Sequence, residues 1–151
     1  MKQGSWLSII TIYCFGVLAV AGLGRILPLN ISAQNLFGVD NIQFAWIFGL
    51  IGIPSLLLSI PLGMLVDNYG PKIILLCGAI AAIFGDIAFG SAQGIIGLQI
   101  GRIFDGIAIS SIYSSGPALL MASTTAKRQV IAMTLWSTCA PVGFALGLIV
   151  G

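Results

Sequence analysis

Residues 63–72 read G-M-L-V-D-N-Y-G-P-K and form a short polar break between two long apolar segments. Gly70 is free to adopt a positive φ angle, and Pro71 suits the first turn of a following helix. Asp67 and Lys72 lie on either side of these two residues. The stretch therefore predicts a tight turn between two helices, with an acidic and a basic residue at its edges.

The composition around this turn excludes an ordinary soluble domain. The chain is 58% hydrophobic and 7% charged, whereas soluble domains carry about 25% charged residues. Apolar runs of about 20 residues can cross the hydrocarbon core of a bilayer as helices, and these runs lack the alternation of β-barrel strands. We expect an all-α polytopic membrane helix bundle with five transmembrane helices, at about Trp6–Leu27, Phe44–Val66, Ile73–Ala92, Ile95–Met121 and Val130–Gly151. The longest connection, 28–43, is expected to be an outer loop.

The basic residues predict the orientation of these helices. If the N-terminus is cytoplasmic, Lys2, Lys72, Lys127 and Arg128 fall on the cytoplasmic side, and only Arg25 lies near the outer face. Cytoplasmic loops carry an excess of basic residues. We therefore expect a multi-pass protein of a cell membrane, by default a bacterial inner membrane, with its N-terminus in the cytoplasm.

The residue types also disfavour several functional classes. The sequence has no histidine and no glutamate, and its net charge of +2 is too small to indicate a nucleic-acid partner. Cys14, Cys77 and Cys139 fall in three different expected helices, without the C-x-x-C spacing of a metal or redox site. We expect no enzymatic activity, no cofactor and no metal site.

Three motifs point to a family. Gly63, Asp67, Gly70 and Lys72 match the signature G-x-x-x-D-(R/K)-x-G-(R/K)-(R/K) that joins the second and third helices of the major facilitator superfamily (MFS), which the chain resembles. Asn68 and Pro71 depart from that signature at positions where the family is usually basic.

Patterns in the later helices resemble the same family. Arg102 with Gly106 and Ala108 is similar to its fourth-helix pattern, R-x-x-x-G-x-(G/A). The fifth expected helix contains a pattern similar to G-P-x-x-G, formed by Pro141, Gly143 and Gly147 with Ala140 in place of the leading glycine. Since that pattern is associated mainly with antiporters, the departure weakens an assignment as an antiporter.

The resemblance implies an MFS-type secondary carrier for a small-molecule substrate, working by alternating access, with coupling to protons as one option. It covers only the first five of the family's usual twelve helices, which are arranged as two halves around a central cavity. We expect residues 1–151 to be the N-terminal part of such a carrier, acting with a missing C-terminal half or a second chain. The alternative is a non-transporting half-carrier subunit or the product of a decayed gene.

Charged residues inside the expected spans are candidates for function, because each costs roughly 2.5–3.5 kcal/mol to insert. Asp86 and Arg102 lie at similar depth on two consecutive helices, so we predict that they pair. Asp105 is three residues from Arg102 and therefore on the same helical face. One arginine facing two carboxylates would favour proton uptake by the excess carboxylate, although a pair that only offsets its own burial is the alternative. Arg25 could reach the outer interface or attract an anionic substrate.

Small residues and prolines mark the expected helices as closely packed and bent. Gly143, Gly147 and Gly151 recur every fourth residue and form a flat face, which lets helices approach closely in lipid. Internal packing is one reading of this face, and dimerisation is the other. Each intrahelical proline removes a backbone hydrogen bond and should kink its helix; these are Pro54, Pro61, Pro117 and Pro141.

Overall fold

The computed structural model describes residues 6–28 and 30–150 and confirms the expected fold class. These residues form helices and turns without a β-strand. Five helical stretches are long and apolar enough to cross a membrane, namely Trp6–Gly24, Asn41–Tyr69, Pro71–Gly90, Ile95–Ser123 and Ala126–Val150. Lys2 and Gly151, on which parts of the sequence argument rest, lie outside the described residues.

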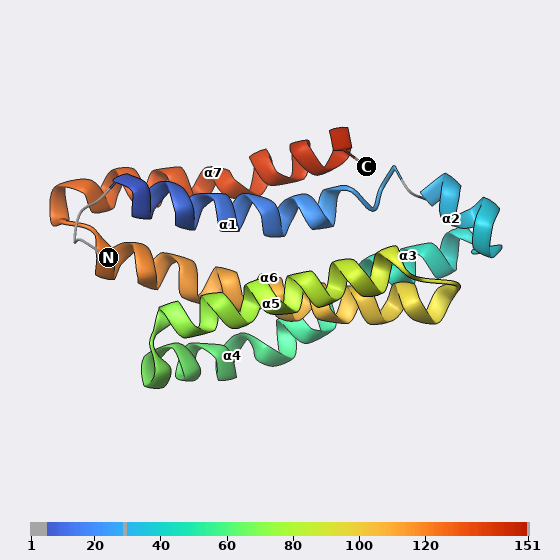
Figure 1. The fold of residues 1–151 in the computed structure, drawn as a ribbon, viewed down its shortest axis with the longest axis horizontal. Coiled ribbons are helices and arrows are strands. Elements are labelled where there is room, and N and C mark those ends of the chain that lie inside the picture. The colour runs from blue at the N-terminus through green and yellow to red at the C-terminus, as the bar shows by residue number, and fades with distance from the viewer. Residues whose placement is uncertain (1–5, 29, 151) are drawn as a thin grey trace.

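Consecutive spans run in opposite directions (Figure 1). The elements in chain order are α1 (Trp6–Gly24), α2 (Asn30–Phe37), α3 (Asn41–Gly49), α4 (Gly52–Tyr69), α5 (Pro71–Gly90), α6 (Ile95–Ser123) and α7 (Ala126–Val150). The α4–α5 and α6–α7 connections lie at the same end of the bundle as the start of α1, whereas α2 and the α5–α6 turn lie at the other end.

The turn between α4 and α5 consists of one residue. Gly70 follows the last residue of α4 and adopts φ 86° and ψ 150°, and its backbone N–H donates to the Val66 carbonyl. Pro71 then occupies the first turn of α5. The predicted positive φ of Gly70 is confirmed, and it allows two long helices to meet with almost no connecting chain.

The expected loop over 28–43 contains the short helix α2, and α3 begins within it at Asn41. Asp40 caps α3: its carboxylate accepts from the Asn41 N–H, and the Gln43 side chain accepts from the Asp40 N–H in a capping box. This acidic residue followed three positions later by glutamine is the usual signature of a helix start. The polar composition of 28–43 concealed that signature.

The second membrane span is broken into α3 and α4. Pro54 has no N–H to donate to the carbonyl four residues earlier, that of Leu50. That carbonyl instead accepts the Ile53 N–H in a tighter turn, at 3.2 Å. The break between Gly49 and Gly52 therefore lies where the missing hydrogen bond of Pro54 would have been.

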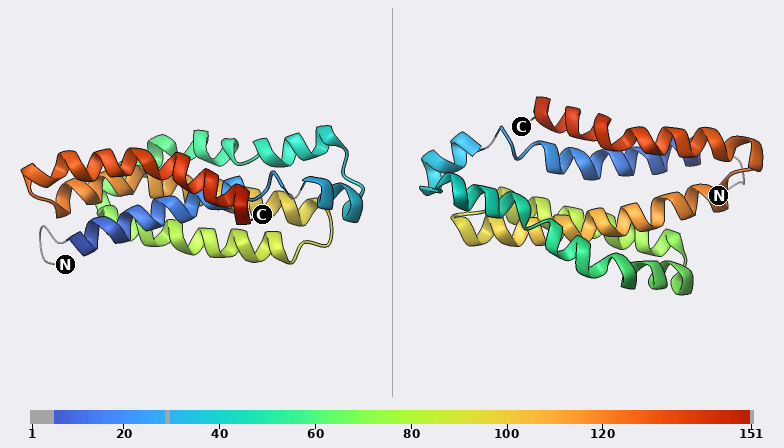
Figure 2. Two further views of the ribbon diagram at one scale, coloured as in Figure 1. Left: turned by 90° about the horizontal axis from the view of Figure 1, so that it is seen from above. Right: turned by 180° about the vertical axis from the view of Figure 1, so that it is seen from behind.

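The helices form two groups (Figures 1 and 2). In the first group α1 packs along α7, and in the second α5 and α4 pack against α6. The groups meet mainly where α1 contacts α6. A buried cluster joins them toward the N-terminal end of α1, where Ile9 and Ile12 lie with Ile112, Leu120 and Trp136.

Candidate functional site

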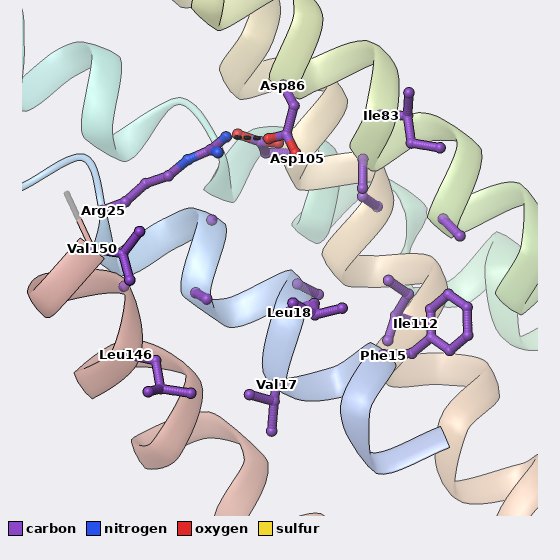
Figure 3. A pocket seen from close by; sticks show the side chains of 17 residues that line it. Phe15, Val17, Leu18, Arg25, Ile83, Asp86, Asp105, Ile112, Leu146 and Val150 are labelled. Atoms are coloured by element: carbon purple, nitrogen blue, oxygen red, sulfur yellow. Dashed lines mark hydrogen bonds and ion pairs between the residues drawn. The ribbon is translucent and has the colours of Figure 1, made fainter. Parts of the chain in front are cut away.

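A cavity of about 520 Å³ lies between the two helix groups (Figure 3). Its walls come from α1, α5, α6 and α7, and most of its surface is formed by apolar side chains such as Leu18, Ile83 and Val150. Arg25, Asp86 and Asp105 are the charged side chains that line it. In Figure 3 the Arg25 side chain reaches across the site toward Asp86 and Asp105.

Arg25 is placed at this site by the packing around the last turn of α1. It follows Gly24 directly, and its backbone N–H donates to the Ala21 carbonyl at 3.1 Å. The next residue, Ile26, is fully buried and belongs to a cluster that includes Phe44 and Leu98. A cation just beyond a helix C-terminus is also favoured by the helix dipole. The position of Arg25 is therefore fixed by the helix that precedes it and by the buried residue that follows it.

The glycines of α7 hold α1 in this position. A Cβ atom on Gly143 would lie 2.5 Å from the Val17 carbonyl oxygen, and one on Gly147 would overlap the backbone of α1 near Ala21. Side chains at these positions would push the two helices apart. Among the described residues, the flat glycine face of α7 is used for packing within the chain.

Arg25 pairs with Asp86 across the cavity, from the end of α1 to α5. The dashed line in Figure 3 marks this ion pair. The side chains are 31% and 52% exposed, respectively. The contact therefore links the two helix groups without being shielded by them.

Arg102 and Asp105 form a second pair within α6, and this pair is buried. The Arg102 side chain is only 1% exposed, and its guanidinium carbon lies 4.8 Å from the centre of the Phe89 ring. The Asp105 carboxylate lies against α5, where a Cβ on Gly85 would be 2.6 Å from Asp105 Oδ1. Sequence reasoning did not identify Phe89 or Gly85, and an aromatic and a glycine in an apolar helix carry no distinguishing signal.

The predicted pairing of Asp86 with Arg102 is wrong. Equal depth in the membrane suggested it, but depth does not decide which carboxylate an arginine contacts. Asp86 is half exposed on the cavity side of α5, whereas Arg102 is enclosed beside Phe89 and Asp105. Asp105, one helical turn away, satisfies Arg102 without any displacement of helices. Asp86 is then available to Arg25.

Some polar atoms of this charge cluster have no hydrogen-bond partner in the described part of the chain. They are Arg25 Nε, Arg102 Nε, Arg102 Nη2 and Asp105 Oδ2, and all are buried. Asp105 Oδ2 and Arg102 Nη2 face each other as an ion pair. The remaining unmet groups are guanidinium N–H donors, so the cluster has more donors than acceptors.

Several other residues singled out from the sequence lie away from the cavity. Gly106 is buried where α6 crosses the break in the second span, and a Cβ there would be 2.5 Å from the Ile51 carbonyl oxygen. Gly63, Asp67 and Lys72 are exposed at the α4–α5 end, and Gly63 has open space where a Cβ would lie. Pro141 is exposed on α7. The structure thus separates the charge cluster from the turn motif.

The serine hydroxyls of α6 do not face the cavity. Ser110, Ser111 and Ser115 each donate to the backbone carbonyl four residues earlier, at 2.6 to 2.8 Å. Tyr113 instead packs on Trp136, with 5.6 Å between the ring centres. These groups therefore belong to the packed core of the bundle, and the charges remain the chemical feature of the cavity.

A model of the Major Facilitator Superfamily matches residues 6–151. The chain belongs to this superfamily. It is 25% identical to an uncharacterized MFS-type transporter of Methanocaldococcus jannaschii, over 86% of this chain and 34% of that protein. It is likewise 25% identical to multidrug resistance protein 1 of Bacillus subtilis, over 86% of this chain and 33% of the relative.

A third relative is the 3-(3-hydroxy-phenyl)propionate transporter of Escherichia coli. The chain is 30% identical to it, and the match covers 91% of this chain and 35% of the transporter. The chain thus spans about a third of the length of these curated relatives. Family membership and the apolar spans together define a multi-pass membrane protein of a transporter superfamily.

Proposed function

We propose that these helices form part of a secondary carrier that moves a small solute across a cell membrane by alternating access. The observation that carries the proposal is the charge cluster at an apolar cavity between two helix groups. Ionisable groups within membrane spans are costly and commonly mark solute or proton pathways. Membership of a superfamily of transporters supports a carrier over an enzyme.

The charged residues have distinct proposed roles. Arg25 and Asp86 face the cavity and hold the two helix groups together, so solute binding can act on this contact. Asp105 also lines the cavity, and with its partner Arg102 it is the candidate for proton coupling. Proton coupling, the coupling ion and the direction of transport belong to the proposal.

The turn motif is proposed to act in gating. Gly63, Asp67, Gly70 and Lys72 lie near the α4–α5 connection, and Gly63 leaves an open surface on α4. We place this turn in the cytoplasm, because Lys72 shares its end of the bundle with Lys127 and Arg128. Further helices, from a C-terminal half or a second chain, would complete the carrier, as the partial coverage of its relatives supports. The default location is a bacterial inner membrane.

Uptake into proteoliposomes tests the proposal. A panel of radiolabelled organic anions, cations and neutral solutes is offered to the 151-residue chain and, in parallel, to the longest reading frame that contains it. We expect gradient-driven uptake of at least one solute, which Arg102→Gln abolishes and the control Lys127→Gln leaves unchanged. Absence of uptake across the panel from both proteins, correctly inserted, would refute the carrier function.

A further inference from the structure

We propose that the cavity binds an organic carboxylate, with the carboxylate on Arg25 and an apolar body between α1, α5 and α7. The inference rests on the proposed carrier function and names its substrate class. The volume of about 520 Å³ is within the range of small-molecule sites, roughly 300–1,000 Å³. Walls such as Leu18, Ile83 and Leu146 suit an aromatic or branched hydrocarbon body.

The donors of the cluster favour an anion over a cation. Arg25 Nε is buried without an acceptor among the described residues, and one of its terminal nitrogens contacts Asp86. A carboxylate can accept from Nε and a terminal nitrogen together, which is the strongest geometry for an arginine. An organic cation would instead leave Arg25 Nε unsatisfied and would face the Arg25 guanidinium in the same space.

Asp86 is the partner that a ligand can replace. Its side chain is 52% exposed, so the surrounding helices do not hold it against Arg25. Asp105, in contrast, is 9% exposed and is already paired with Arg102 on its own helix. The exchange therefore takes place at Arg25, and the buried pair stays intact.

The charges of the cluster are balanced before a ligand binds. Arg25 and Arg102 offset Asp86 and Asp105, and these are the charged groups that α1, α5 and α6 bring to the cluster, while α7 contributes none to the cavity. A bound carboxylate adds one negative charge. Asp86 is the group that must give way to it, and removal of the Asp86 charge should therefore favour binding.

Matched probes test the charge preference directly. The probes are 3-phenylpropionate, its neutral amide and 3-phenylpropylamine, measured by equilibrium dialysis against the full chain in detergent. We expect the carboxylate to bind more tightly than the amide and the amine. Arg25→Gln should weaken carboxylate binding about 10- to 100-fold, since hydrogen bonds to charged groups are lost. The control Lys127→Gln, which removes a cation outside the cavity, should leave binding unchanged.

Asp86→Asn distinguishes a loss of ligand contacts from a loss of structure. It breaks the same ion pair as Arg25→Gln, but it is expected to strengthen carboxylate binding instead of weakening it. Without a competing carboxylate, Arg25 should bind the probe several-fold more tightly at pH 8. The probe is ionised at this pH, because carboxyl groups ordinarily titrate near pH 4.

A further matched pair checks that the cavity holds the probe. Ala82→Phe fills the cavity and should abolish binding, whereas Ala122→Phe, on an exposed part of α6, should not. Carboxylate binding that is unaffected by Arg25→Gln or by Ala82→Phe would overturn the inference. Preferred binding of the amine, lost in Asp86→Asn, would overturn it too while leaving the carrier function standing. The inference would also be overturned if no probe binds and no carboxylate is taken up while another solute still is. The carrier function would again be left standing.

Discussion

Arg102 is a guanidinium within a membrane span with 1% of its side chain exposed. Its stability there depends on Asp105 and on the face of the Phe89 ring. A buried pair adds little net stability, but removal of one partner leaves an uncompensated charge. The effects of substituting Arg102 and Asp105 on stability should therefore depend strongly on each other.

We predict that Arg102→Ala lowers the free energy of unfolding by about 3–5 kcal/mol, as found when one member of a buried pair is removed. Asp105→Ala should have a similar effect. The double variant should recover most of the loss, because no charge is left unpaired. Thermal unfolding in detergent measures all three, with Lys127→Ala as the surface control. Additive losses in the double variant would contradict the coupling.

The pairing of charges could be predicted only in part from the sequence. Their presence within spans was evident from the apolar runs around Asp86, Arg102 and Asp105. Their depth could be counted along the helices, but depth does not give rotation about the helix axis. Arg25 also joined the cluster through a long side chain, which crosses from α1 to α5. Residues far apart in the chain meet in ways that local spacing does not encode.

At the scale of elements, the spans were predictable because length and apolarity determine them. The bounds differ by a few residues: the last helix begins at Ala126 instead of about Val130, since Lys127 and Arg128 continue the helix beyond the apolar run. A kink at Pro54 was predicted, but the full division of the second span into α3 and α4 was not. It depends on the hydrogen bond that Pro54 cannot make, and several prolines in the chain lie within uninterrupted helices.

The contact of α7 with α1 gives a prediction at this scale. Gly143→Leu should destabilise the protein by about 1–3 kcal/mol, the range for overpacking a close contact, because even a Cβ would lie 2.5 Å from the Val17 carbonyl oxygen. The control Gly49→Leu has open space and should be neutral or slightly stabilising. Unfolding in detergent compares the two. Equal effects of both variants would show that α7 does not pack on α1 through this face.

The same contact connects packing to the site. Gly143 and Gly147 lie on the side of α7 that meets the second half of α1, and Arg25 follows directly after that helix. Separation of α1 from α7 would therefore move Arg25 away from Asp86. Variants of these glycines should alter carboxylate binding as well as stability, although glycine has no charged side chain that could bind the ligand.

At the scale of the whole molecule, two helix groups enclose the cavity and Arg25–Asp86 joins them. We predict the direction in which this arrangement faces the membrane from its basic residues. Lys72, Lys127 and Arg128 lie at one end, whereas Arg25 lies toward the other. Because basic loops stay in the cytoplasm, the α4–α5 and α6–α7 connections should face inward and the α5–α6 turn outward.

Single cysteines test this orientation in intact cells. Cys14, Cys77 and Cys139 are first replaced by alanine, and Ser91→Cys or Thr125→Cys is then introduced, since both positions are exposed in connections at opposite ends. A membrane-impermeant maleimide should label the cysteine at 91 from outside. It should label the one at 125 only after permeabilisation. The reverse pattern would place Arg25 at the cytoplasmic face, and the charged residues of the cavity would then meet solute from the opposite side of the membrane.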